Sequence, residues 1–218
     1  ISIEGNGEPL TGSRAITFAD LLGTQARPED VVEAEAHDIC MIMFTSGTTG
    51  PSKGTLMPHA HSILFGFGAG RALKMTPEDC MFICMPFFHA MGLMLQLTSC
   101  LVYGSSAHVI RRFSATTWLD EIRACKATLT YGLGVIPEFI FRQPPSPHDK
   151  DHNLRSMVAV PIGEDWGAPF EERFGLRLVQ AYGMTECNIP AYGRLEDPIM
   201  AGCAGHIDDD FFEVKIVD

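Results

Sequence analysis

The sequence predicts a layered α/β fold with a largely parallel sheet. Short apolar runs of strand length alternate with stretches of helix length over most of the chain, and this alternation is typical of strand–helix–strand units. The composition, 46% hydrophobic and 20% charged over 218 residues, supplies enough apolar material for a core. We expect residues 1–38 to flank this domain and residues 39–218 to form its core.

The predicted elements begin with a short helix at residues 18–22. A buried strand follows at 39–45, because the run is apolar until it ends in hydroxyl side chains. A helix is predicted over 59–75, with Ile63, Leu64 and Phe67 among its apolar positions, although three glycines weaken it. Next come a strand at 80–85, a buried helix at 87–101 and a strand at 107–110.

The second half of the chain continues the alternation. Ser114 is expected to cap a helix over 115–126, which is followed by a strand at 127–131 and a helix at 135–141. A proline-rich connector separates these elements from the rest. Beyond it we expect a strand at 157–160, a helix at 169–174, and strands at 178–181 and 211–217.

Charge and cysteine content limit the function classes. A formal net charge of −11 with 16 Lys and Arg argues against a nucleic-acid partner. Seven cysteines without a C-x-x-C pair favour reduced, buried thiols in a cytoplasmic protein. The N-terminus lacks the pattern of a signal peptide. The stretch between Asp79 and Arg111 is uncharged, but proline, histidine and glycine interrupt it, so no integral membrane segment is expected.

The stretch after the first strand is suited to binding an anion. Hydroxyl side chains and glycines lie around a lysine, and such a loop can turn backbone N–H groups toward a phosphate. These residues are Thr45, Ser46, Gly47, Thr48, Thr49, Gly50, Lys53 and Gly54. A polar surface turn would be the plain alternative. A P-loop is excluded by spacing, because Ser52 precedes Lys53 and Gly54 follows it.

A second group of functional side chains lies at residues 180–186, after a predicted strand. Tyr182 offers a ring on which a base can stack, Thr185 offers a hydroxyl to a phosphate, and Glu186 offers an oxygen ligand for Mg²⁺. A loop with an exposed carboxylate is the alternative. A third candidate is His89, between aromatic residues and Gly92, although a lone histidine in an apolar stretch is more often a core residue.

Together these segments resemble the motifs of the adenylate-forming superfamily, which contains acyl-CoA synthetases, luciferases and adenylation domains. The stretch Thr45–Gly54 is similar to its T-S-G-T-T-G-x-P-K-G phosphate loop, with Ser52 where the family usually has proline. Residues 182–186 match its Y-G-x-T-E motif, and His89 lies in a segment similar to P-x-x-H-x-x-G. The segment 160–166 departs from the family's G-G-A-P, which normally borders adenine.

The resemblance implies roles for these residues. ATP would contact the phosphate loop and a second group of residues, which comprises Ala181, Tyr182, Gly183, Met184 and Thr185. Lys53, His89, Thr185 and Glu186 would serve catalysis, and Glu186 would hold Mg²⁺. The chain would form the central part of the enzyme's large N-terminal domain and lack the small C-terminal domain, so it is expected to be inactive alone.

The implied reaction is the ATP-dependent activation of a carboxylic acid through an acyl-adenylate, followed by thioester formation with coenzyme A. The crotonobetaine/carnitine-CoA ligase branch is similar around residues 170–186, which suggests fatty acid or carnitine metabolism. Two alternatives stay open: an adenylation domain that loads a carrier protein, and a non-catalytic nucleotide-binding fragment. A homodimer is also left open. Phe87, Phe88 and Met91 predict a partly apolar acid pocket without naming the acid.

Overall fold

The computed structural model describes residue 23, residues 31–45 and residues 51–217. The predicted helix at 18–22 and the phosphate-loop residues 46–50 lie outside the described residues. The chain divides into two units, 1–35 and 36–218, and all elements below belong to the second unit.

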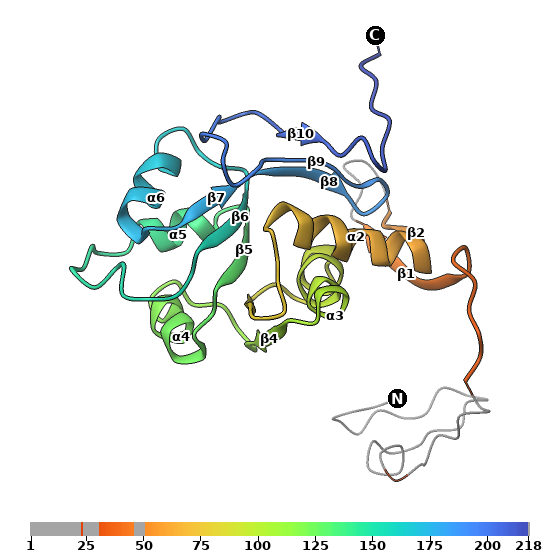
Figure 1. Cartoon of the computed structure of the whole chain (residues 1–218), viewed down its shortest axis with the longest axis horizontal. Helices are drawn as coiled ribbons and strands as arrows, with labels where there is room; N and C mark the ends of the chain where they lie inside the picture. Colours follow the sequence, from red (N-terminus) through yellow and green to blue (C-terminus); the bar gives the residue numbers. More distant parts are fainter. Residues whose placement is uncertain (1–22, 24–30, 46–50, 218) are drawn as a thin grey trace. The chain divides into compact units, whose positions relative to one another are not determined.

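A five-stranded parallel sheet organises this unit, in the order β4-β3-β5-β6-β7 (Figure 1). Its strands are β3 (Cys80–Ile83), β4 (Ser106–Val109), β5 (Leu129–Leu133), β6 (Ser156–Val160) and β7 (Arg177–Val179). Every pairing within it is parallel. The prediction of a layered α/β fold with a largely parallel sheet is therefore confirmed.

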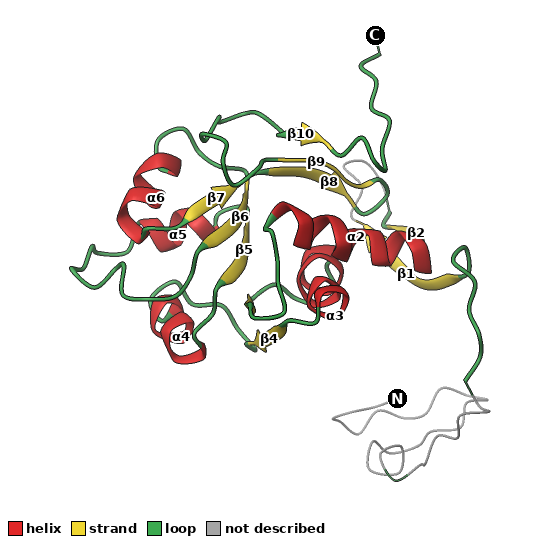
Figure 2. Cartoon of the chain, in the orientation of Figure 1, coloured by secondary structure: helices red, strands yellow, loops and turns green. Residues whose placement is uncertain are grey.

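Helices cover both faces of this sheet (Figure 2). One face packs against α4 (Trp118–Cys125), α5 (Ile136–Phe141) and α6 (Gly167–Phe174). The other packs against α2 (His59–Ala72), the π-helix η2 (Met91–Leu97) and α3 (Thr98–Tyr103). Alternate strand residues serve the two cores: in β6, Met157 faces the first and Val158 the second.

The predicted strand at 39–45 exists as β1 (Ile39–Thr45), but its predicted burial is wrong. It pairs antiparallel with β2 (Lys53–Pro58), which was not predicted, and together they form a separate hairpin (Figure 1). Of the seven β1 residues only Met43 is buried. An apolar run indicates a strand, but it cannot reveal that the strand joins a two-stranded hairpin instead of the central sheet.

A second antiparallel sheet contains β8 (Ala181–Met184), β9 (Asn188–Tyr192) and β10 (His206–Ile207), with β9 in the middle. The expected strand at 178–181 is interrupted at Gln180, so part of it belongs to β7 and part to β8. β9 was not predicted. The strand predicted at 211–217 is wrong, because this segment forms no ladder with any described residue.

Helix α2 confirms the predicted helix but buries a different face. Ile63 is 53% exposed and Phe67 is 36% exposed, whereas the three glycines and the alanines at 69 and 72 are buried. A Cβ placed on Gly66 would lie 2.8 Å from the backbone carbonyl carbon of Thr98. One placed on Gly70 would lie 2.2 Å from the Tyr103 ring. The glycines therefore allow α2 to approach α3 closely.

The predicted cap of the fourth helix is also wrong. α4 begins at Trp118, and its N-cap is Thr117, which makes no capping hydrogen bond through its side chain. The Ser114 hydroxyl instead contacts the Thr116 hydroxyl at 2.9 Å.

The seven cysteines are free thiols that form no disulfide. Their predicted burial is only partly confirmed, because Cys100 is buried whereas Cys203 is exposed.

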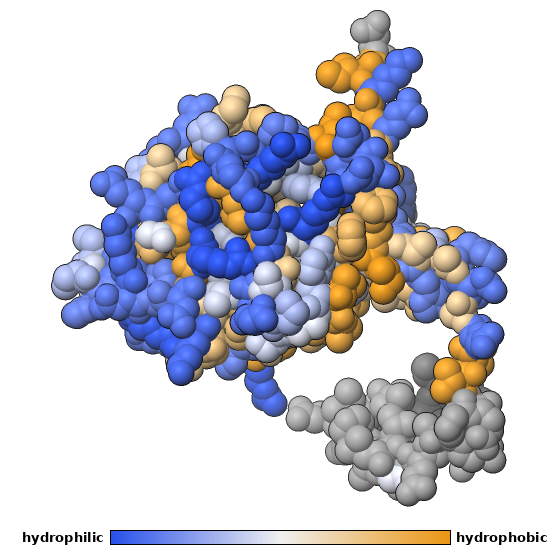
Figure 3. Space-filling model, in the orientation of Figure 1, coloured by the Kyte–Doolittle hydropathy of each residue, from blue (hydrophilic) through white to orange (hydrophobic). Residues whose placement is uncertain are grey.

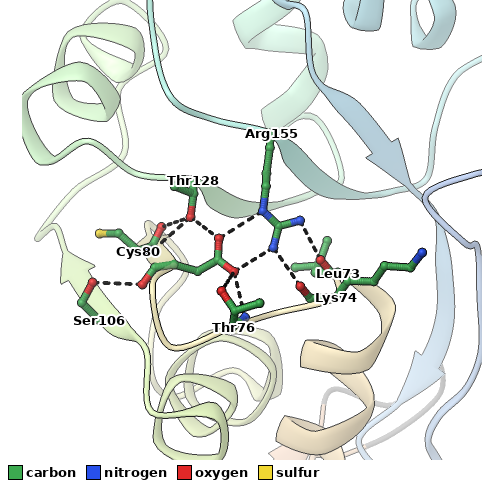
Figure 4. Close-up of polar contacts among 8 residues, drawn as sticks. Leu73, Lys74, Thr76, Cys80, Ser106, Thr128 and Arg155 are labelled. Carbon is green, nitrogen blue, oxygen red and sulfur yellow. Dashed lines mark hydrogen bonds and ion pairs between the residues drawn. The ribbon is translucent and has the colours of Figure 1, made fainter.

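A partly buried ion pair ties together the amino ends of the parallel strands (Figure 4). The Asp79 carboxylate, just before β3, accepts hydrogen bonds from Arg155 Nη2 at 2.7 Å and from Thr128 Oγ1 at 2.6 Å. Arg155 also donates to the Leu73 and Lys74 carbonyls at the end of α2. This cluster fixes α2 and three strands at the sheet edge opposite the candidate site.

Hydrophobic side chains also reach the surface in the region of α2 and α3 (Figure 3). Leu101 is 75% exposed and Phe67 is 36% exposed. Across the part of the chain that the structure describes, no helix combines the length and the hydropathy needed to cross a bilayer.

Candidate functional site

A cavity of about 580 Å³ lies beside the carboxyl ends of β5 and β6 and under the hairpin. Its walls come from β1, β2, α2, η2, the parallel sheet and the β8–β9 pair. Eight of the predicted site residues line it: Thr45, Lys53, His89, Ala181, Gly183, Met184, Thr185 and Glu186. The two main motifs, more than a hundred residues apart in sequence, therefore share one cavity.

The contact that joins these motifs is a hydrogen bond. Thr45 Oγ1, at the end of β1, donates to Glu186 Oε1 at 3.1 Å. Thr45 is also the register partner of Lys53 at the start of β2, and the lysine lines the same cavity as Glu186. A hydroxyl, an ammonium and a carboxylate consequently lie together at the polar mouth of the cavity.

The turn between β8 and β9 is fixed to α2 by two further contacts. His61 Nε2 lies 2.9 Å from the Thr185 carbonyl oxygen, and Asn188 Nδ2 donates to the His61 carbonyl oxygen at 2.9 Å. Asn188 is buried and has a φ of 68°, a left-handed conformation that asparagine tolerates better than most residues. Sequence reasoning missed His61 and Asn188, because neither belongs to a recognisable motif and only the folded chain brings them to Thr185.

His89 lies at the cavity, in the turn before η2. Partial burial lowers its pKa below the usual value, so the ring is neutral at pH 7. Its Nδ1 accepts a hydrogen bond from the Met91 backbone N–H at 3.0 Å, which leaves the proton of the neutral ring on Nε2. His89 is thus a neutral ring with a donor at Nε2, at a position that lines the cavity.

Tyr182 is placed differently from the other motif residues. It belongs to β8, pairs with Ala191 and is 50% exposed, but it does not line the cavity. A base stacked on its ring would therefore bind outside the cavity. Ser46, Gly47, Thr48, Thr49 and Gly50 lie outside the described residues, so their predicted phosphate contacts remain predictions.

The segment 160–166, whose sequence differs from the G-G-A-P motif, continues from the carboxyl end of β6. Val160 lines the cavity, while Ile162 and Trp166 are buried in the core on the other face of the sheet. This segment is therefore held in place by its own packing, next to the residues that line the site.

Comparison with known proteins identifies the family. A model of the AMP-binding enzyme family matches residues 4–218. The chain belongs to the AMP-binding enzyme family.

Curated relatives agree with this assignment. Crotonobetaine/carnitine–CoA ligase of Salmonella enteritidis is 31% identical over 190 residues, which is 86% of this chain and 37% of the ligase. Long-chain fatty acid transport protein 3 of Mus musculus is 31% identical over 156 residues, 71% of this chain and 23% of that protein. The chain thus spans well under half of the length of these relatives.

Solved structures of the family share the fold. A malonyl-CoA ligase with methylmalonyl-CoA and AMP bound aligns with a TM-score of 0.71 and 27% identity, covering 79% of this chain and 38% of that one. An O-succinylbenzoate coenzyme A synthetase from Bacillus subtilis, in complex with AMP, gives a TM-score of 0.74 at 23% identity over 88% of this chain and 40% of its own length.

The residues present at the cavity mouth suit Mg²⁺ bound together with a substrate. No group of three or more metal-ligating side chains occurs among the residues described here. Mg²⁺ commonly takes one or two carboxylates plus substrate phosphates and water. Glu186, exposed at the cavity mouth, provides one such carboxylate. Phosphate oxygens of a bound triphosphate, together with water, would supply the other ligands of the metal.

Proposed function

We propose that this protein activates a carboxylic acid with ATP and transfers the acyl group to coenzyme A, as an AMP-forming acid–thiol ligase. The supporting observation is the Thr45–Glu186 hydrogen bond at the mouth of a cavity that Lys53 and Thr185 also line. Thr45 and Lys53 offer donors to an anion, whereas Glu186 offers a metal ligand, and a magnesium triphosphate requires both.

In the proposed reaction the acid's carboxylate oxygen attacks the α-phosphorus and pyrophosphate leaves. The coenzyme A thiol then loses its proton and attacks the carbonyl carbon of the acyl-adenylate, so that the C–S bond of the thioester forms and AMP leaves. The residues act by positioning and by charge stabilisation, because phosphoryl transfer needs little covalent work from a protein. Lys53 would neutralise the departing phosphates and Thr185 would orient the α-phosphate.

Three further roles belong to the same proposal. When bound at Glu186, Mg²⁺ would supply positive charge to the phosphate oxygens. Neutral His89, which keeps its proton on Nε2, would donate a hydrogen bond to the acid's carboxylate. Tyr182 would stack on adenine beside the cavity, which leaves the cavity for the acid. A cytoplasmic location is part of this proposal.

The proposal is tested by calorimetric titration of the protein with ATP, with and without Mg²⁺. Glu186→Gln should weaken ATP binding in Mg²⁺ by about tenfold, the effect of losing one charge-assisted contact. Glu172→Gln, which changes an exposed carboxylate on α6, serves as the matched control. If the affinity for ATP depends neither on Mg²⁺ nor on the Glu186→Gln change, the proposed ligase activity is refuted and a non-catalytic nucleotide-binding fragment is favoured.

A further inference from the structure

The cavity has a polar mouth and an apolar interior. All the described charged side chains that line it, Lys53 and Glu186, belong to the hairpin and to the β8–β9 turn at the mouth. The interior is bounded by α2 on one side and by the parallel sheet on the other. Phe65, Ala69, Tyr131 and Val158 form these walls, and each is no more than 2% exposed.

The apolar lining continues below the carboxyl edge of the sheet. Tyr131 and Leu133 of β5 line it and are register partners of Val158 and Val160 of β6. From Leu133 back to Tyr131, the lining on this face of the sheet extends roughly 7 Å below the carboxyl edge, at about 3.3 Å per residue. On α2 the lining runs from Phe65 to Ala72, roughly 10 Å of helix at 1.5 Å per residue.

The polar groups inside are already satisfied. Tyr131 donates its hydroxyl proton to the Ala69 carbonyl at 3.4 Å, and Tyr192 donates to Asp208 Oδ2 at 2.6 Å. Arg71 holds the other Asp208 oxygen at 3.0 Å, so that carboxylate is paired. A second carboxylate or an ammonium group on the substrate would therefore find no free charged partner among the described interior residues. Burial of such an unpaired charge is costly.

We infer that the interior takes the uncharged hydrocarbon tail of an aliphatic monocarboxylic acid. This inference rests on the proposed function and specifies its acid. The carboxylate would stay at the mouth near Lys53 and His89, and the tail would pass between α2 and strands β5 and β6. Ala69 and Ala72 contribute only methyl groups, so their small size sets the room available for the tail.

The inference predicts how affinity depends on chain length. Acetate, butyrate and octanoate are titrated calorimetrically into the protein saturated with a non-hydrolysable ATP analogue, together with malonate and carnitine. Each added methylene should tighten binding by about fourfold while the tail remains inside the cavity. Malonate and carnitine should bind at least tenfold more weakly than octanoate. Equal affinity along the aliphatic series, or a preference for either charged acid, would overturn the inference.

A variant locates the tail. Ala69→Phe fills the interior and should reduce octanoate affinity by tenfold or more, with little change for acetate. Ala60→Leu enlarges an exposed position on the same helix and should leave both unchanged. If Ala69→Phe does not fold, Ala72→Val gives the same test with a smaller change. Octanoate affinity that is unaffected by a folded variant would contradict the placement.

Different results would reject the proposed ligase activity and the proposed aliphatic acid. Retained Mg²⁺-dependent ATP binding without octanoate binding would reject the aliphatic acid and leave the ligase intact. Loss of both would reject the ligase itself.

Discussion

At the scale of single residues, the Asp79 carboxylate accepts hydrogen bonds from three residues outside the candidate site, Thr76, Thr128 and Arg155. Burial raises the pKa of its carboxyl, but hydrogen bonds from Arg155, Thr128 and the Thr76 backbone outweigh this effect and hold the net pKa below its usual value. A carboxylate whose pKa is lowered by folding stabilises the folded state, because protonation breaks these contacts.

Asp79→Asn should therefore lower the free energy of unfolding at pH 7. Breaking a buried ion pair costs 3–5 kcal/mol, but Arg155 is more than a third exposed, so about 2 kcal/mol is expected here. The stabilisation is fully present above the unfolded pKa of about 3.8 and disappears as pH falls through the lower folded value.

Urea unfolding at pH 7 and in the acid range measures this difference. Glu78→Gln alters the exposed neighbouring carboxylate and should change the free energy of unfolding by less than about 0.5 kcal/mol. An Asp79→Asn effect that stays constant down to the lowest pH would show that the ion pair is not its source.

At the scale of elements, the packing of α2 on α3 decides how the cavity wall is placed. The helix carries Phe65, Ala69 and Ala72 into the cavity, and its Gly66 and Gly70 meet α3. Intrinsic helix propensity favours alanine over glycine by about 1 kcal/mol. Replacing one of these glycines with alanine therefore improves helix propensity but crowds the contact with α3.

Gly66→Ala should destabilise the protein by about 1–3 kcal/mol, because the new methyl group would press on the Thr98 backbone, which cannot rotate away. Thermal or urea unfolding provides the measurement. Ile63→Ala, at an exposed position of the same helix, should have a much smaller effect. A stabilised Gly66→Ala protein would mean that propensity prevails and that α2 and α3 are not in close contact.

At the scale of the whole molecule, the alternating strands and helices were predictable because both faces of a parallel sheet are buried and its strands form short apolar runs. The β1–β2 hairpin and β9 were not predicted, because β2 begins at Lys53 and Gly54 within the predicted phosphate loop, and β9 follows directly after a functional turn. The buried face of α2 was also missed, because apolar patterning does not register glycine as a packing surface.

The site was predictable where chemistry is concentrated in short motifs. Thr45, Lys53, His89, Thr185 and Glu186 were all identified from sequence, and the fold brings them to one cavity. His61 and the alanines of α2 could not be identified, because their positions depend on how distant elements pack. The position of Tyr182 outside the cavity likewise depends on the separate β8–β9 sheet.

The most direct test of the central claim, that two distant motifs bind one magnesium triphosphate, is a double-mutant cycle. Affinity for ATP with Mg²⁺ is measured by calorimetry for the unmodified protein, Thr45→Val, Glu186→Gln and the double variant. Residues in contact around one ligand should couple by about 0.5–3 kcal/mol, so the double variant should lose less than the sum of the single losses. Thr45→Val combined with Glu172→Gln is the additive control. Strict additivity of Thr45 and Glu186, within about 0.3 kcal/mol, would contradict a shared site.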